Sequence, residues 1–192
     1  MTAGLILGRR SRGTEVDMAM VLAVLAGCTL LLIRTSFTGL PATATMFAAL
    51  YLLLGAASLA VPVGGDGARS LSSLSVGAAG MTAIVLAAWL VGPGFPVPHA
   101  LEVLLLNSLA AVSEELFFRR LVYGGLVRFG PAIAIGGSAL LFATLHVPIY
   151  GPAVFWVDLG AGLLLSWQRW ASGGWGAPAA THVVANLVAV LR

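Results

Sequence analysis

The sequence contains no lysine and little charge of either sign. Only 9% of its 192 residues are charged, and all side-chain positive charge outside histidine comes from ten arginines. Soluble domains carry about 25% charged residues, because their surface must interact with water. Charge this sparse excludes a soluble globular domain, a disordered chain and a nucleic-acid-binding protein.

Cysteine is also nearly absent, since Cys28 is the only one. A single cysteine excludes an internal disulfide and a thiolate metal cluster. Residues 25–28 (Leu-Ala-Gly-Cys) match a bacterial lipoprotein cleavage box. However, Glu15 and Asp17 interrupt the basic region before it, and the apolar run continues after Cys28. We therefore expect a retained first helix rather than a cleaved signal.

Apolar residues make up 59% of the chain, and the mean hydropathy is +1.01. A membrane-spanning helix needs about 20 mostly apolar residues. Glycine- and proline-rich stretches separate the apolar segments from one another. The sequence predicts an all-α, polytopic membrane helix bundle with about seven transmembrane helices. The segments are 18–33, 42–63, 71–92, 100–122, 131–147, 153–167 and 177–191.

The arginines predict the orientation of this bundle, because cytoplasmic loops carry an excess of positive charge. Three arginines precede the first segment, so the N-terminus is expected in the cytoplasm. With seven crossings, five more arginines lie on the cytoplasmic side and two lie on the opposite side. We expect a multi-pass protein of the cell membrane, namely a bacterial inner membrane. The three groups are Arg9, Arg10 and Arg12; Arg69, Arg119, Arg120, Arg128 and Arg169; and Arg34 and Arg192.

Polar residues inside the apolar segments divide the chain into two regions. Segments within residues 1–92 contain almost no ionisable side chain, so about three motif-free membrane helices are expected there. Residues 93–192 contain many, and a charge at mid-membrane is costly enough to indicate a functional site. We predict the catalytic core in this region, after the proline-rich stretch 92–98. Its polar residues are Glu102, Asn107, Glu114, Glu115, Arg119, His146, Asp158, His182 and Asn186.

The first of three constellations is Glu-Glu-Leu-Phe-Phe-Arg at 114–119. Glu115 and Arg119 are four residues apart with the acid first, the favourable order for an ion pair on one helix face. Glu114 points elsewhere, without a cation on its own helix, which suits a general base. The alternative is an acidic-basic cluster at the membrane interface, with Arg119 and Arg120 as anchors.

The second and third constellations each place two residues one helical turn apart. Phe142 precedes His146 by four residues, so the aromatic ring can hold the imidazole and exclude water. His182 precedes Asn186 by four, which offers two side-chain donors for a developing oxyanion. The alternative for either histidine is a hydrogen bond to a carbonyl of a neighbouring helix.

Glu-Glu-x-x-x-Arg, Phe-x-x-x-His and His-x-x-x-Asn, in this order on successive helices, resemble the CPBP family. This family comprises type II CAAX prenyl endopeptidases and bacterial Abi proteins. The resemblance covers about residues 100–191 and implies an intramembrane protease with a helical bundle around a cavity. It implies that protein or peptide substrates are cut at the lipid bilayer, while prenylation of the substrate stays open.

The resemblance also assigns roles to residues. It implies that Glu114 activates a water and that His146 helps to hold it. Glu115 and Arg119 would orient the base and its helix. The remaining roles are oxyanion stabilisation by His182 and Asn186, and packing or substrate binding by Phe118 and Phe142.

Metal use is a separate question, because two histidines and a glutamate are the ligand set of many zinc sites. Zinc would be held by Glu114, His146 and His182. The His-Glu-x-x-His pattern is absent, and the structural picture of the family favours a metal-free glutamate mechanism. We expect no metal cofactor.

Two other functions fit parts of the sequence. Residues 136–139 (Gly-Gly-Ser-Ala) faintly resemble a rhomboid nucleophile loop, with Ser138 as nucleophile and His182 as base. A small helix-packing residue is the simpler interpretation of Ser138. A catalytically inactive family member acting as an immunity or scaffold protein is one alternative. A small transporter is another, and Asp158 and Glu102 within membrane segments are the residues that it would use. Convergence of Glu114, His146, His182 and Asn186 on one cavity discriminates between these functions.

Overall fold

The computed structural model describes residues 3–37, 43–63, 72–91 and 100–191, and within these ranges it contains helices and no strand. Every predicted apolar segment forms a helix, as the all-α prediction requires. The chain order is α1 (Ala3–Ile33), η1 (Arg34–Phe37), α2 (Thr43–Ala60), α3 (Ser73–Val91), α4 (Ala100–Glu115), η2 (Leu116–Val122), α5 (Tyr123–Leu126), η3 (Val127–Phe129), α6 (Pro131–Tyr150), η4 (Pro152–Val154), α7 (Phe155–Ser172) and α8 (Gly176–Leu191). The glycine- and proline-rich stretches that separate the first four apolar segments, at 38–41, 64–67 and 92–98, lie outside the described residues, as do Arg69 and Arg192.

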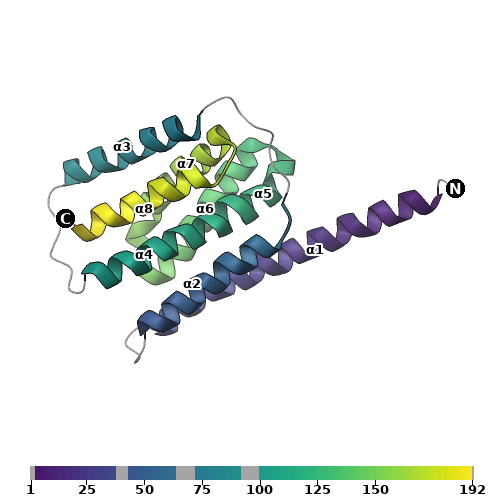
Figure 1. Cartoon of the computed structure of the whole chain (residues 1–192), viewed down its shortest axis with the longest axis horizontal. Coiled ribbons are helices and arrows are strands. Elements are labelled where there is room, and N and C mark those ends of the chain that lie inside the picture. The colour runs from purple at the N-terminus through teal and green to yellow at the C-terminus, as the bar shows by residue number, and fades with distance from the viewer. Residues whose placement is uncertain (1–2, 38–42, 64–71, 92–99, 192) are drawn as a thin grey trace.

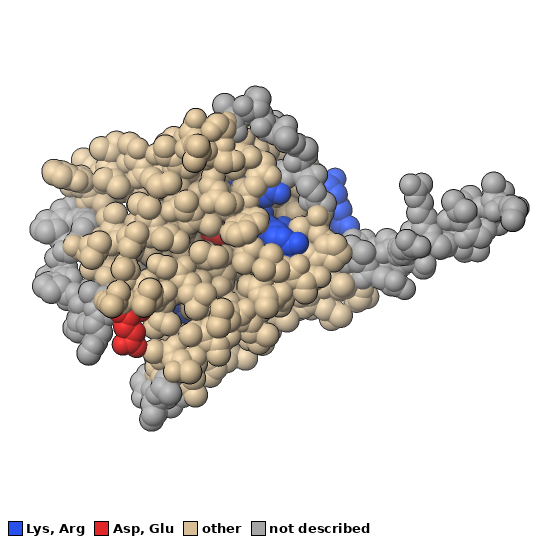
Figure 2. All heavy atoms as spheres, in the orientation of Figure 1, with Lys and Arg blue, Asp and Glu red and all other residues tan. Residues whose placement is uncertain are grey.

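The chain is a membrane protein by the length and apolarity of its helices. Among the residues that the structure describes, four spans are long and apolar enough to cross a bilayer: Met18–Phe37, Thr43–Ala60, Ser73–Leu90 and Pro131–Tyr150. Large apolar side chains point outward from the bundle; Trp89 is 83% exposed and Leu90 is 89% exposed. The face seen in Figure 2 carries few charged residues. Lipid tails accommodate such a surface, whereas water does not. The count of seven crossings stays a prediction.

The helices pack as one bundle in which α8 lies between α3 and α4, and α2 packs on the other side of α4 (Figure 1). Helices α6 and α7 pack against each other, and α1 contacts α2 and α6. The N-terminal part of α1 extends past the bundle. The α1 helix begins at Ala3 rather than at residue 18, because the polar residues before the apolar run continue the same helix.

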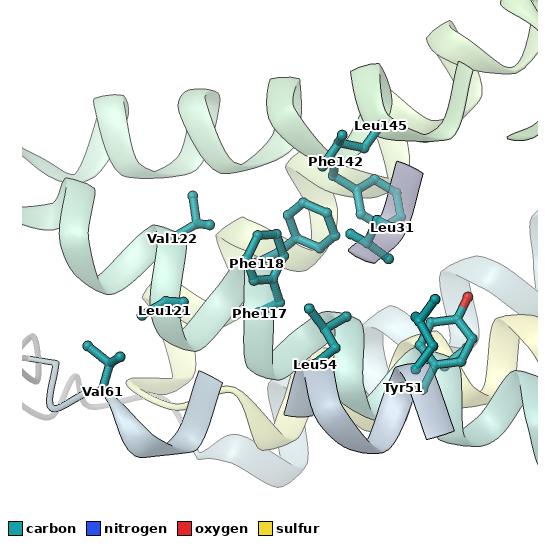
Figure 3. Packing of buried hydrophobic residues seen from close by; sticks show 12 residues of the cluster. Leu31, Tyr51, Leu54, Val61, Phe117, Phe118, Leu121, Val122, Phe142 and Leu145 are labelled. Atoms are coloured by element: carbon teal, nitrogen blue, oxygen red, sulfur yellow. The ribbon is translucent and has the colours of Figure 1, made fainter. Parts of the chain in front are cut away.

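The hydrophobic core lies between α1, α2, η2 and α6 (Figure 3). Phe118 forms edge-to-face contacts with Phe117 and Phe142, with ring centroids 4.9 and 5.2 Å apart. Arg120 donates through Nη1 to the carbonyls of Ser58 and Val61, which satisfies oxygens at the C-terminal end of α2.

A buried polar cluster joins α3, α7 and α8. Gln168 donates through Nε2 to the carbonyl of Val76 and to the Thr181 hydroxyl, each at 2.9 Å. Both polar side chains are fully buried. Gly80 leaves room for the amide, because a Cβ there would lie 2.0 Å from Gln168 Nε2. This cluster fixes the helix that later positions His182.

Candidate active site

The two glutamates stand at the end of α4, where the helical hydrogen-bonding pattern changes. Residues Leu116–Val122 form a π-helical segment directly after Glu115. Such segments occur often at functional sites, since they redirect side chains within a helix. The fully buried residues Glu115 and Arg119 both belong to this region.

Glu115 is held by two cationic or donor groups. Its Oε1 accepts from Arg119 Nη1 at 3.0 Å and from His182 Nδ1 at 2.9 Å. Arg119 also donates through Nη2 to the carbonyl of Gly162 at 3.2 Å and lies 4.7 Å from the centroid of the Phe142 ring. The predicted Glu115–Arg119 pair is therefore present. The interface-anchor alternative is wrong for Arg119, which is fully buried.

Glu114 faces a different direction and meets both histidines. Its Oε2 lies 3.8 Å from His146 Nε2 and 4.0 Å from His182 Nε2. These distances exceed a direct hydrogen bond but suit one bridging water. The side chain is almost fully buried, with only 5% exposed.

A hydrogen bond to its own helix fixes the tautomer of His146. Its Nδ1 lies 2.8 Å from the carbonyl oxygen of Phe142, which can only accept, so Nδ1 carries a hydrogen. In the neutral ring, Nε2 then presents a lone pair toward Glu114. The Phe142 ring lies 4.2 Å from the imidazole, and Tyr150 stacks at 5.8 Å. An aromatic residue beside His146 was predicted and is present.

His182 lies between the two glutamates. Its Nδ1 bonds Glu115 and its Nε2 faces Glu114. The Glu115 contact was not predicted, because it joins residues 67 positions apart.

Asn186 donates through Nδ2 to the carbonyl of Asn107 at 3.0 Å, which leaves one amide hydrogen free for another acceptor.

The four convergent residues line one cavity of about 420 Å³, a volume in the range of small-molecule and peptide sites. The cavity lining therefore brings together Glu114, His146, His182 and Asn186, with Phe142 beside them. Phe118 is buried in the core and does not line this cavity. The structure shows that Glu114, His146, His182 and Asn186 line the same cavity. The catalytic roles of these residues stay predictions.

Comparison with family models places this site in a known group of membrane enzymes. Residues 96–188 match the model described as Type II CAAX prenyl endopeptidase Rce1-like. This region of the chain belongs to that family. No curated protein and no solved structure matches the chain significantly. All six predicted catalytic residues lie within the matched Rce1-like region, and membership implies a protease that acts on a peptide or protein at the membrane.

The Rce1-like region also contains residues that the alternative functions would use. Ser138 is fully buried and donates to the carbonyl of Phe118 at 2.9 Å, which engages the hydroxyl that a serine protease would need. Glu102 is exposed at the first turn of α4 and does not line the cavity that contains Glu114. Asp158 does line the cavity, from the first turn of α7.

Glu114, His146 and His182 are the donor set that a zinc site here would use. Tetrahedral zinc with ligands at about 2.0–2.1 Å brings neighbouring donor atoms to about 3.4 Å. The Glu114 Oε2 atom lies 3.8 and 4.0 Å from the two Nε2 atoms. Among the described residues, no group of three or more His, Cys, Asp or Glu side chains has the spacing of a metal site. The donor atoms of Glu114, His146 and His182 thus lie further apart than the ligands of a tetrahedral zinc site.

Arginine and tyrosine side chains that the sequence analysis did not place at the site also line the cavity. Arg34, from η1, and Tyr150, at the end of α6, both line the cavity. Arg34 had been counted only as a charge on the far side of the membrane. The available signal was its position directly after the apolar run of the first segment, inside the span Met18–Phe37.

Proposed function

We propose that the chain is an integral membrane endopeptidase that hydrolyses peptide bonds of membrane-associated proteins or peptides, with Glu114 as general base. The observation that carries this proposal is the position of Glu114 Oε2, within one-water reach of both His146 Nε2 and His182 Nε2. A carboxylate and an imidazole lone pair around one buried point suit a nucleophilic water.

In the proposed first step, the water donates one hydrogen to Glu114 and the other to Nε2 of His146. Its oxygen attacks the scissile carbonyl carbon while its proton moves to the Glu114 carboxylate. The hydrogen bond between His146 Nδ1 and the Phe142 carbonyl keeps Nε2 in the accepting form. A C–O bond forms and the carbonyl oxygen becomes an oxyanion.

The oxyanion is stabilised from α8. Asn186 offers the amide hydrogen that the Asn107 carbonyl does not use. His182 donates from Nε2 when both ring nitrogens are protonated, while its Nδ1 stays bonded to Glu115. The intermediate then collapses, the C–N bond breaks, and Glu114 returns its proton to the leaving amine. No step is routed through a metal.

The proposed setting is the inner membrane of a bacterium with the N-terminus in the cytoplasm. The substrate is a membrane-associated protein or peptide, such as a peptide under maturation or a membrane-anchored regulator. The apolar part of the cavity lining, which includes Ile84, Val154 and Leu165, suits an apolar stretch near the scissile bond.

The test is mass spectrometry of new protein N-termini in native membranes that express the wild type or Glu114→Gln. The matched control is Glu102→Gln, which makes the same chemical change on the same helix outside the cavity. Termini present with the wild type and Glu102→Gln but absent with Glu114→Gln support the proposal and identify the substrate. Identical profiles for all three support the inactive scaffold, immunity or transporter function instead.

A further inference from the structure

One arginine of the catalytic cavity comes from outside the Rce1-like region. Arg34 lies in η1, directly after α1, and lines the cavity together with Glu114 and His182. It belongs to the membrane span Met18–Phe37. A guanidinium there is costly unless it pairs with another group, so its position calls for a functional explanation.

Aromatic rings hold this arginine in place. Its Cζ atom lies 5.4 Å from the centroid of Phe47, 5.7 Å from Tyr51 and 5.6 Å from Tyr150. Its Nη2 donates to the Tyr150 hydroxyl at 3.2 Å. Cation–π contacts stabilise the charge but leave the in-plane N–H groups unused. These rings come from α2 and α6, so the packing of the bundle fixes the guanidinium at the cavity.

The guanidinium therefore has donors to spare. Arginine carries five N–H donors. Within the described residues, the Tyr150 hydroxyl is the hydrogen-bond acceptor of Arg34, and none of the ion pairs involves Arg34. Arginine binds carboxylates through two parallel hydrogen bonds, which gives both affinity and orientation. Rings keep the group in place, and its free donors suit an anionic ligand in the cavity.

We propose that Arg34 is a specificity-determining residue that pairs with a carboxylate of an apolar peptide bound in the catalytic cavity. This inference rests on the proposed endopeptidase function and adds a substrate class to it. Tyr150 links the two ends of the site, because its hydroxyl bonds Arg34 and its ring stacks on His146. A carboxylate on Arg34 thus sets the position of the peptide relative to the proposed water.

The carboxylate can be a chain terminus or an acidic side chain, and four probes separate these sources. They are acetylated Leu-Val-Leu with a free C-terminal carboxylate, its C-terminal amide, and the amides of acetylated Leu-Glu-Leu and Leu-Gln-Leu. Binding is measured by titration calorimetry on the full chain in lipid nanodiscs. All proteins carry Glu114→Gln, so that bound peptides are not hydrolysed and the result does not depend on turnover.

With Arg34 intact, we expect at least one carboxylate probe to bind about tenfold or more tightly than its neutral partner. The terminal pair responds if the ligand is a chain end, and the Glu/Gln pair responds if it is a side chain. Arg34→Gln should bring the ratio close to one, whereas Arg34→Lys, which keeps the charge without the planar donors, should give an intermediate value. Arg128→Gln removes an exposed arginine outside this cavity and should leave the ratio unchanged.

A merely structural role for Arg34 would weaken all four probes equally, so an unchanged ratio in Arg34→Gln overturns the inference. Equal binding of each acid and its neutral partner by the protein with Arg34 intact also overturns it, even if Arg34→Gln fails to fold. Neither result affects the proteolysis test, which compares N-termini that depend on Glu114. Failure of the inference and failure of the proposed function are thus distinguishable.

Discussion

Glu115 and His182 are joined by a 2.9 Å hydrogen bond between Oε1 and Nδ1, although 67 positions separate them in the chain. The same carboxylate oxygen accepts from Arg119. One buried acid thus connects the end of α4, the π-helical segment after it and the histidine of α8. Glu115 does not line the cavity, but its hydrogen bond fixes the orientation of the His182 imidazole, which does.

Glu115→Gln should strongly destabilise the protein, because Arg119 is fully buried and would lose its carboxylate partner. Removing one partner of a buried ion pair lowers the free energy of unfolding by about 3–5 kcal/mol, because the other charge is left unpaired. The measurement is the free energy of unfolding in mixed micelles. Glu114→Gln is the matched control. Among the described residues, the Glu114 carboxylate has no ion-pair or histidine contact shorter than 3.8 Å. We therefore expect this variant to lose less than about 1 kcal/mol of unfolding free energy. Equal losses in both variants would contradict this account.

Glu114→Ala and His146→Ala should each abolish proteolysis of the substrate identified from the new N-termini. The first removes the base, and the second removes the acceptor that orients the water. Asn186→Ala should keep a reduced rate, because His182 remains as an oxyanion donor and one lost donor costs about 2.7–4 kcal/mol of barrier stabilisation. Initial cleavage rates in reconstituted vesicles measure the three variants. A fully active Glu114→Ala would falsify the mechanism.

The helices were predictable because backbone polar groups in lipid must bond within their own segment. Their ends were less predictable. The segment expected at 153–167 continues to Ser172, since Arg169 is buried rather than interfacial and donates to the carbonyl of Arg119 at 3.0 Å. The π-helical segment after Glu115 left no signal either, because a change of hydrogen-bond register does not alter the apolar pattern.

The site was predictable where its contacts run along one helix. Pairs four residues apart, such as Glu115 with Arg119 and Phe142 with His146, follow from helical spacing. Contacts between helices were not predictable. The Glu115–His182 bond and the position of Arg34 at the cavity depend on how distant segments pack, and the spacing of residues in one chain does not encode this.

Gly162→Ala should destabilise the contact between α6 and α7. A Cβ at this position would lie 3.0 Å from Ala139 Cα and 3.2 Å from its carbonyl oxygen, so backbone must shift. The same glycine presents its carbonyl to Arg119. We expect a loss of about 1–3 kcal/mol, the usual range for overpacking. Gly160→Ala is the matched control on the same helix, where a Cβ meets nothing within 4 Å, and its better helix propensity should keep or raise stability. Thermal unfolding of both variants checks this, and an equal effect would contradict it.

Activity should survive chelation. The proposed mechanism uses Glu114 as the base for a water, and the 3.8 and 4.0 Å between its carboxylate oxygen and the two Nε2 atoms are wider than the spacing of tetrahedral zinc ligands. We expect cleavage rates within about twofold before and after dialysis against a strong chelator, a change of less than about 0.5 kcal/mol in the barrier. Elemental analysis of the purified protein should find less than one zinc per chain. Loss of activity on chelation, with recovery on adding zinc alone, would assign Glu114 to the metal and remove its role as the base.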